Sequence, residues 1–153
     1  YTVMSRAPLG VGMFSAVWMC ANKDSKLVAL KVIRWQDHFR KYAEKEVAAL
    51  QLVTERAEMD KEGSPFLAIL REHFVHSVGQ REHLCMCFEK LETDLRSAGR
   101  QPLQKVLKFS KQLLLGLRYL HDFVGLIHCD VKPDNVMLRW DGQAVKLCDF
   151  GTA

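Results

Sequence analysis

One short loop holds three residue types that together suit the transfer of a phosphoryl group. Asp130, Lys132 and Asn135 all lie in the stretch 126–138. Phosphoryl transfer needs a carboxylate that orients and deprotonates the attacking hydroxyl, a cation beside the transferred phosphate, and an amide oxygen on a metal ion. The loop therefore predicts this chemistry. The alternative is a structural turn with polar surface residues, which would have to meet the same offsets by coincidence.

A hairpin follows this loop and carries a further carboxylate. Residues 136–140 and 144–148 are largely apolar runs, and Asp141-Gly142 between them is a strong hairpin signal. The second run leads directly into Asp149, in the sequence Asp-Phe-Gly. Because a hairpin reverses the chain, we expect Asp149 to return beside the loop.

Together these two motifs resemble the catalytic and metal-binding segments of eukaryotic protein kinases. HCDVKPDN resembles the kinase pattern H-R-D-x-K-x-x-N, and DFG follows it as it does in kinases. A lysine two residues after the Asp resembles the serine/threonine-specific branch. The resemblance implies that Asp130 accepts or orients the proton of the substrate hydroxyl, and that Lys132 stabilises charge on the transferring group. It implies further that Asn135 and Asp149 bind Mg²⁺.

Composition is that of an ordinary globular domain, with 48% hydrophobic and 26% charged residues among 153. The net charge of +4 comes from scattered Lys and Arg, which does not argue for nucleic-acid binding. The odd count of five cysteines, with no signal-peptide pattern, predicts reduced thiols in the cytosol or nucleus. Cys85-x-Cys87 could be a metal pair, but two buried thiols on one strand face are favoured. No apolar run approaches membrane-spanning length.

The glycine-rich stretch 9–17 (LGVGMFSAV) lies between two predicted strands. Glycines let backbone N–H groups approach a phosphate closely. A lone G-x-G is more often a plain hairpin turn, but this position resembles the kinase glycine-rich loop. The loop, with Gly10 and Gly12, is therefore expected to cover the nucleotide phosphates. Ser15 stands where that loop usually has its third glycine.

A strand at 27–33 carries one charge, Lys31, in the middle of an apolar run. A buried lysine is costly unless it is paired, whereas a lysine on an edge strand could point outward. VALK resembles the kinase strand whose lysine holds the α- and β-phosphates and pairs with a helix glutamate. The helix predicted at 37–59 offers Glu46 at the edge of its apolar face. Glu44 lies about 200° around the helix and points elsewhere, so Glu46 is the predicted partner.

That predicted helix has an apolar face of Ala43, Val47, Leu50, Val53 and Ala57. After it, strands are predicted at 66–70 with 74–75 and at 84–88, separated by a polar loop at 78–82. A second helix is predicted at about 103–122, with Gly125 as its stop signal. The buried stripe predicted for this second helix is Val106, Ser110, Leu113, Leu114, Leu117 and Leu120.

By resemblance, Phe88 lies at the back of an adenine pocket, and the backbone of Glu89 and Leu91 meets the adenine edge. Asp94 would lie near the ribose. The complete nucleotide-binding set implied by the resemblance is Leu9, Gly10, Gly12, Val17, Ala29, Lys31, Glu89, Leu91, Asp94 and Met137. The implied catalytic set is Lys31, Glu46, Asp130 and Lys132, and the implied cofactors are ATP and Mg²⁺.

The expected fold is α+β and protein-kinase-like: an antiparallel N-lobe sheet with one regulatory helix, then the start of a mainly helical C-lobe, truncated after DFG. Residues 1–91 would form the N-lobe and hinge, and 92–153 the beginning of the C-lobe. HLCMCFEKLETDL, HxDxKPDN, VKLCDFGTA and GMFSAV are most similar to the spliceosome-associated pre-mRNA-processing kinases of the CMGC group. This implies a protein substrate, splicing-related partners and a nuclear or cytoplasmic location, with no direct nucleic-acid or membrane partner.

Three further expectations concern activity. Neither chain end resembles a domain boundary, so we expect an incomplete kinase domain that is inactive alone. The alternatives are a nucleotide-binding or interaction module without catalysis, and a small-molecule kinase of similar fold. Cys129 replaces the usual Arg of H-R-D, which commonly contacts a phosphorylated activation loop, and a thiol cannot make that charge-assisted contact. Activity is therefore expected not to depend on that switch.

Overall fold

The computed structural model describes all 153 residues and divides them into two compact units. Unit 1 holds Tyr1–Ala48 and Ile69–Lys90, and unit 2 holds Ala49–Ala68 and Leu91–Ala153. The expected division after residue 91 lies beside the passage from unit 1 to unit 2. The segment Ala49–Ala68, however, groups with unit 2.

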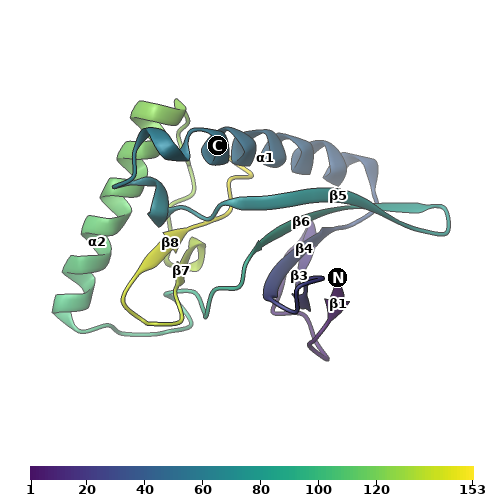
Figure 1. The fold of residues 1–153 in the computed structure, drawn as a ribbon, viewed down its shortest axis with the longest axis horizontal. Helices are drawn as coiled ribbons and strands as arrows, with labels where there is room; N and C mark the ends of the chain where they lie inside the picture. The colour runs from purple at the N-terminus through teal and green to yellow at the C-terminus, as the bar shows by residue number, and fades with distance from the viewer. The chain divides into compact units, whose positions relative to one another are not determined.

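Unit 1 is built on a six-stranded antiparallel sheet (Figure 1). Its strand order is β1-β3-β4-β6-β5, and β2 pairs separately with β3. β4 is therefore an inner strand, with β3 on one side and β6 on the other. The strands are β1 (Thr2–Val3), β2 (Gly10–Val11), β3 (Ser15–Ala21), β4 (Leu27–Ile33), β5 (Leu70–Val78) and β6 (Arg81–Glu89).

One face of this sheet carries the hydrophobic core of unit 1. Successive strand residues point to opposite faces, so alternate positions of β3, β4 and β6 share a face. The core cluster on this face is Cys20, Val28, Leu30, Cys85 and Cys87, with Trp18, Val32 and Phe74 packed against it. The two thiols of the Cys85-x-Cys87 pair are thus core residues, and the chain has no cluster of three or more His, Cys, Asp or Glu suited to a metal.

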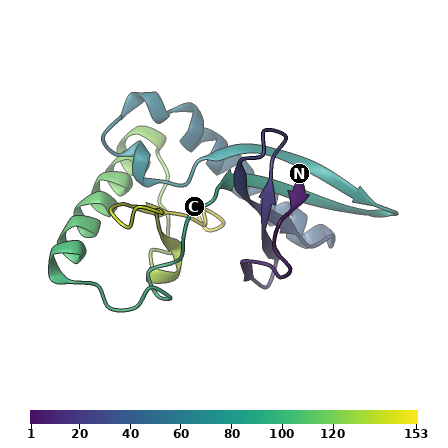
Figure 2. The same cartoon turned by 60° about the horizontal axis from the view of Figure 1, so that its bottom comes forward.

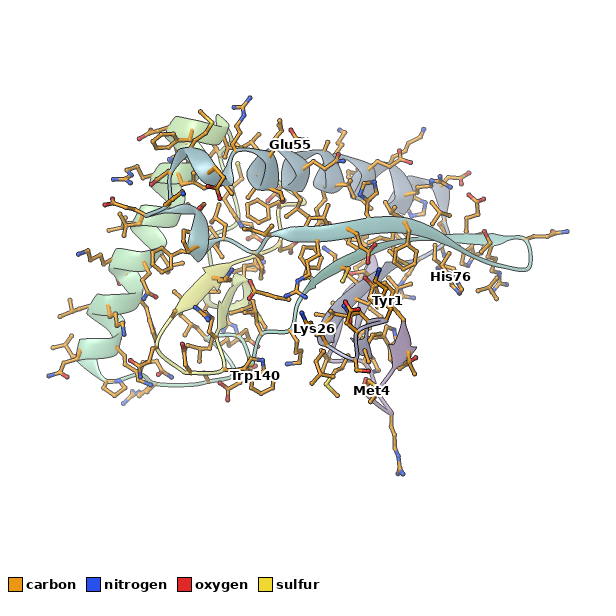
Figure 3. The ribbon with its side chains drawn as sticks, in the orientation of Figure 1. Tyr1, Met4, Lys26, Glu55, His76 and Trp140 are labelled. Carbon is orange, nitrogen blue, oxygen red and sulfur yellow. The ribbon has the colours of Figure 1, made fainter.

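The β5–β6 hairpin is longer than the sequence analysis predicted. The expected polar loop at 78–82 is wrong, because β5 runs to Val78 and β6 starts at Arg81. Only a two-residue turn remains, with Gly79 at φ 60°. Both ribbon views show this hairpin extending beyond the neighbouring strands of the sheet (Figures 1 and 2). His76 lies toward its tip (Figure 3). Polar residues near the tip of a hairpin can still be part of its strands, because the hydrogen bonds between the strands use only backbone groups.

The strand predicted at 66–70 is also wrong for most of its length. Ser64–Phe66 is a 3₁₀ turn with Pro65 as its second residue, and β5 begins only at Leu70. Leu67 is fully buried and forms an isolated parallel bridge with Leu147 of unit 2. This apolar segment therefore packs as a buried connection, which hydrophobicity alone does not distinguish from a strand.

Helix α1 (Asp37–Glu55) confirms the first predicted helix, and a 3₁₀ turn, Ala57–Met59, follows it. Asp37 lies in its first turn, where an acidic side chain favours the helix dipole. Of the predicted apolar face, Ala43, Val47, Leu50 and Val53 are buried, while Ala57 is half-buried in the 3₁₀ turn. The helix starts in unit 1 and ends in unit 2, with the division between Ala48 and Ala49.

Helix α2 (Leu103–Arg118) continues as a π-helical turn, Tyr119–Val124, and ends at Gly125 with φ 77°. The turn is fixed to the end of α1, because the Tyr119 hydroxyl donates to the Val53 carbonyl at 2.6 Å. The predicted buried stripe of α2 is largely wrong: Val106, Ser110 and Leu114 are exposed, Leu113 and Leu117 are half-buried, and only Leu120 is buried.

The buried side of α2 is rotated from the predicted one because it centres on Phe109 and Gly116. A Cβ added at Gly116 would lie 3.2 Å from a Leu67 methyl carbon and 3.4 Å from Phe66 Cβ. This glycine therefore lets the 64–67 segment pack closely against the helix. Periodicity did not reveal the position, since glycine has no apolar side chain to count.

Strands β7 (Val136–Leu138) and β8 (Val145–Leu147) form the predicted hairpin in register Val136↔Leu147. Its turn contains Gly142 at φ 59°, as expected for Asp-Gly. The hairpin lies beside α2 (Figure 1), where Gln112 Oε1 accepts a hydrogen bond from the Val145 amide at 3.0 Å. Trp140, next to the turn, is 62% exposed (Figure 3).

Candidate active site

The glycine-rich loop of unit 1 is a tight turn between β2 and β3. The Leu9 amide donates to the Val17 carbonyl at 2.7 Å, and the Gly12 amide donates to the Ser15 carbonyl at 2.8 Å. Neither glycine has a positive φ. A Cβ added at Gly10 would meet nothing within 4 Å, and one at Gly12 would meet only Ser15 atoms, at 3.7 and 3.9 Å. No other part of the protein therefore fills the space beside these two glycines, and a ligand could approach their backbone closely.

Lys31 lies on the inner strand β4 and pairs with Glu46 of α1. Its Nζ donates to Glu46 Oε1 at 2.6 Å and to Oε2 at 2.8 Å. The side chains are 18% and 7% exposed, so the lysine is neither on an edge strand nor pointing into solvent. The expected ion pair is present, and Glu44 lies elsewhere, exposed and paired with Arg40 at 3.1 Å.

The face of the sheet that carries Lys31 also carries other predicted nucleotide-binding residues of unit 1. Val17 is the cross-strand partner of Lys31, and Ala29 precedes Lys31 by two residues. Ala29 pairs in turn with Phe88 of β6. Since directly opposed and alternate strand residues share a face, these side chains lie together opposite the cysteine-rich core. Glu89 ends β6, within unit 1, and is half-buried.

In unit 2 the segment after Leu91 is paired with β7 through its backbone. The Glu92 amide donates to Leu138 O at 2.9 Å, and the Leu138 amide donates to Thr93 O at 2.7 Å. Asp94 forms a bridge with Met137, so two further predicted nucleotide-binding residues are neighbours. Leu91 is buried.

The carboxylate of Asp94 closes a local turn. It accepts hydrogen bonds from the Ser97 amide at 2.8 Å and the Ser97 hydroxyl at 2.6 Å. Burial opposes ionisation of Asp94, but the hydrogen bonds from Ser97 and nearby amides outweigh it and hold the pKa of this carboxyl below its ordinary value. The ribose role predicted for Asp94 stays a prediction.

The loop with Asp130 forms a compact polar cluster in unit 2. Lys132 Nζ donates to Asp130 Oδ2 at 2.6 Å, and Asn135 Nδ2 donates to the same Oδ2 and to Asp130 O, both at 2.9 Å. Asn135 is 6% exposed, at the end of the 3₁₀ turn Pro133–Asn135. Because its amide nitrogen is directed at Asp130, its Oδ1 is the atom left for an electropositive partner.

The same contacts keep both members of the Asp130–Lys132 pair charged. The hydrogen bond from Lys132, with a smaller contribution from Asn135, lowers the pKa of the Asp130 carboxyl. The hydrogen bond to Asp130 raises the pKa of the Lys132 ammonium. A carboxylate and an ammonium thus coexist across the neutral range.

Asp149 is the second residue after β8, at an exposed position with φ 66°. The preceding residue fixes it beside the loop that holds Asp130 and Asn135, since the Cys148 amide donates to Asn135 O at 2.8 Å. Phe150 is 1% exposed and its ring lies 5.2 Å from that of His128. The hairpin therefore returns Asp149 next to the loop, as the sequence predicted.

His128 is an anchor that the sequence analysis did not assign. It is 1% exposed, its Nδ1 is 3.3 Å from the Asp130 amide, and its Nε2 is 3.0 Å from Cys148 O. Nδ1 accepts from that amide, so Nε2 carries the proton that the Cys148 carbonyl accepts. One ring thus joins the Asp130 and Asp149 segments. In the sequence, a single histidine after the apolar Ile127 gave no indication of these two contacts.

Two other features of this loop also went unpredicted. Arg96 Nε donates to Asp134 Oδ1 at 2.6 Å, and this contact lowers the pKa of the Asp134 carboxyl.

Cys129 is exposed and has φ 62°, a left-handed conformation that is uncommon outside glycine, asparagine and aspartate. Strained backbone of this kind often occurs at functional sites.

The donor set around Asn135 and Asp149 fits Mg²⁺ bound together with nucleotide phosphates. Both residues offer oxygen atoms, which Mg²⁺ prefers, and such sites use only one or two carboxylates and complete the shell with phosphate and water.

Residues 3–153 match the family described as the protein kinase domain. The chain belongs to the protein kinase family. The kinase is 36% identical over 152 residues to the serine/threonine-protein kinase SRPK of Physarum polycephalum, an alignment that covers 88% of this chain and 35% of that protein. It is 37% identical over 145 residues to protein kinase dsk1 of Schizosaccharomyces pombe, covering 90% of this chain and 26% of that protein.

A third relative of this kinase is the serine/threonine-protein kinase prp4 of Schizosaccharomyces pombe, at 32% identity over 161 residues, with 100% of this chain and 32% of that protein covered. The predicted kinase family is thus confirmed, with relatives named as serine/threonine kinases. The chain spans about a quarter to a third of the length of these three relatives. None of its helices has the length and apolar character needed to cross a membrane.

Proposed function

We propose that this kinase transfers the γ-phosphoryl group of ATP to serine or threonine hydroxyls of a protein, with Mg²⁺ as cofactor. The observation that carries the proposal is the cluster of Asp130, Lys132 and Asn135, with Asp149 tied beside it through the Cys148–Asn135 hydrogen bond. The cluster supplies a base, a cation and two oxygen donors within one unit.

In this reaction Asp130 is the group that receives or orients the proton of the attacking hydroxyl. Its lowered pKa keeps it ionised at neutral pH, which favours orientation of the hydroxyl over strong proton abstraction before the transfer. Lys132, already 2.6 Å from that carboxylate, is close enough to offset negative charge on the transferring group. Mg²⁺ held by Asn135 and Asp149 would supply charge neutralisation on the phosphates.

Unit 1 carries several of the residues that we propose to bind the nucleotide. Lys31, with its charge balanced and its direction fixed by Glu46, contacts the α- and β-phosphates in this proposal. Gly10 and Gly12 let the loop backbone approach the phosphates, and Val17 and Ala29 form an apolar surface for the base. Glu89 contributes backbone groups from unit 1. Within unit 2, Leu91 is proposed to contribute backbone groups, and the neighbouring residues Asp94 and Met137 to contact the ribose and base.

By the sequence resemblance we propose a nuclear or cytoplasmic protein whose substrates and partners include splicing-related proteins. The similarity to kinases named SRPK and prp4 supports the proposal of splicing-related substrates and partners. Neither a membrane nor a nucleic acid is proposed as a direct partner.

The test measures nucleotide binding and phosphoryl transfer separately in the protein and in its Asp130→Asn variant. Fluorescent ATP with Mg²⁺ reports binding, and γ-labelled ATP with myelin basic protein reports transfer. We expect both proteins to bind. Transfer is expected from the unsubstituted protein only, and it is measured in the complete protein that contains these residues, because residues 1–153 alone are expected to be inactive. Binding without transfer by the unsubstituted protein would favour a nucleotide-binding module, and absence of binding would overturn the proposal entirely.

A further inference from the structure

The glycine-rich loop of unit 1 makes an aromatic contact with α1 that neither the sequence analysis nor the proposed mechanism uses. Phe14, at the end of this loop, has its ring centroid 5.2 Å from that of Phe39 and 6.3 Å from that of Tyr42. The planes are tilted by 59° in the first pair and by 27° in the second. Both pairs lie within the range of favourable aromatic contacts.

The backbone fixes where the Phe14 ring can lie. The Phe14 carbonyl accepts a hydrogen bond from the Arg34 amide at 2.9 Å, which ties the loop to the residue after β4. The next residue, Ser15, pairs with Ile33 and is buried. Phe14 is therefore the last loop residue before the sheet, and its side chain connects the loop with the helix.

The aromatic residues of α1 lie on the same side as Glu46. Residues three or four apart on a helix are neighbours, so Phe39, Tyr42 and Glu46 follow one another along one side. Glu46 in turn holds Lys31 through two hydrogen bonds of 2.6 and 2.8 Å. The same side of α1 thus carries both the aromatic contact with the loop and, one turn further on, the partner of Lys31.

Burial does not account for this cluster. Phe14 remains 47% exposed and Tyr42 60% exposed, so both rings keep much of their apolar surface in water. Their contact removes little apolar area, while it restricts where the loop lies relative to the helix.

We propose that Phe14, Phe39 and Tyr42 are positioning residues that fix the glycine-rich loop relative to the Lys31–Glu46 pair. This inference rests on the proposed function, because it concerns how the same site receives the nucleotide phosphates. The loop and Lys31 then form one preorganised phosphate-binding surface. Loss of the Phe14 ring, or of a ring that it contacts on α1, releases the loop without changing the lysine.

The experiment is a double-mutant cycle of Phe14→Ala and Tyr42→Ala, read as affinity for ATP with Mg²⁺ and, separately, for adenosine. Each single change should weaken ATP binding by about two- to tenfold, the range expected for one aromatic contact. The double variant should be little worse than Phe14→Ala, since that change already removes the contact with Tyr42. Adenosine affinity should not change, because adenosine has no phosphates for the loop to cover.

Two control variants test whether the effect is specific to the aromatic contact of Phe14. Tyr42→Phe retains the ring and should bind ATP like the unsubstituted protein. Trp35→Ala removes an aromatic residue that is also 47% exposed and contacts Arg81, and it should leave ATP affinity unchanged. Melting curves identify any variant that fails to fold, and kcat should change less than KM for ATP.

The outcomes separate the inference from the function on which it rests. Additive effects of the two alanine changes, or equal loss of ATP and adenosine binding, would overturn the positioning role while the unsubstituted protein still binds ATP. If the unsubstituted protein binds no ATP at all, the proposed function fails first, and the inference with it.

Discussion

The two units each contain a lysine–carboxylate pair with the same shortest distance and very different surroundings. Lys31–Glu46 in unit 1 and Lys132–Asp130 in unit 2 both have an N–O distance of 2.6 Å. The side chains of the first pair are 18% and 7% exposed, whereas those of the second are 46% and 34% exposed. The first joins a strand to a helix across 15 residues, and the second joins residues two apart in one loop.

This difference in exposure indicates that the two ion pairs have different roles, although both join a lysine to a carboxylate. A buried pair depends on both members, because removing one leaves a charge without water or partner. A solvated pair contributes little to stability and can exchange its partner for a substrate. We therefore interpret the first pair as a fixed part of the scaffold and the second as a pair available to a reacting group.

The largest expected effect follows from Asp130→Asn, which should lower kcat about 10²- to 10⁴-fold, the range for a positioned general base. Because Asp130 is partly exposed, the melting temperature should hardly change. Asp122→Asn makes the same chemical change at an exposed carboxylate in the π-helical turn and serves as the control. A large loss of stability in Asp130→Asn would contradict the distinction between the two pairs.

Lys31→Met should reduce stability by about 3 kcal/mol, because it leaves Glu46 buried without its partner. The double variant Lys31→Met with Glu46→Leu should regain most of that stability but not the affinity for ATP. Urea unfolding and ATP titration measure the two properties. If the double variant is as unstable as the single one, the ion pair is not the source of the loss.

Lys132→Met is the matched change in the exposed pair and should leave the melting temperature nearly unchanged while kcat falls. An exposed pair is screened by water and holds two mobile side chains, so its removal has little effect on folding. Equal destabilisation by Lys31→Met and Lys132→Met would remove the contrast on which this interpretation depends.

The smallest effect concerns pH. Asp130 has a pKa below its ordinary value of about 3.9, so its stabilising contact is fully present above that pH and is lost as the pH falls through the folded-state pKa. In Lys132→Met the carboxyl should titrate nearer the ordinary value. Carboxyl ¹³C NMR follows this titration directly, and a titration above pH 4 in the unsubstituted protein would refute the assignment.

Local patterns predicted the parts of the site that depend on short stretches of sequence. The offset of Glu46 on its helix identified the partner of Lys31, and Asp-Gly identified the hairpin that returns Asp149. Each inference needed only helix geometry or turn chemistry. The roles of these residues in nucleotide binding and transfer stay predictions.

Sequence patterns gave wrong predictions where residues far apart in the sequence determine which side of a helix is buried. Helix α2 has apolar residues on more than one side, and the 64–67 segment covers the side with Phe109 and Gly116. The pattern alone gave no reason to prefer that side over the one with Leu114. His128 was missed for a similar reason, since its two partners, Asp130 and Cys148, are brought together only by the fold.

The tight packing at Gly63 predicts that some loss-of-function variants of this kinase lie far from the reacting groups. A methyl group there would lie 2.4 Å from the Leu115 carbonyl oxygen and 2.7 Å from Tyr119 Cβ, so α2 would have to shift. The same helix holds β8 through Gln112, and Asp149 is the second residue after β8. A genetic screen for inactive alleles should therefore recover position 63, although no reacting group touches it.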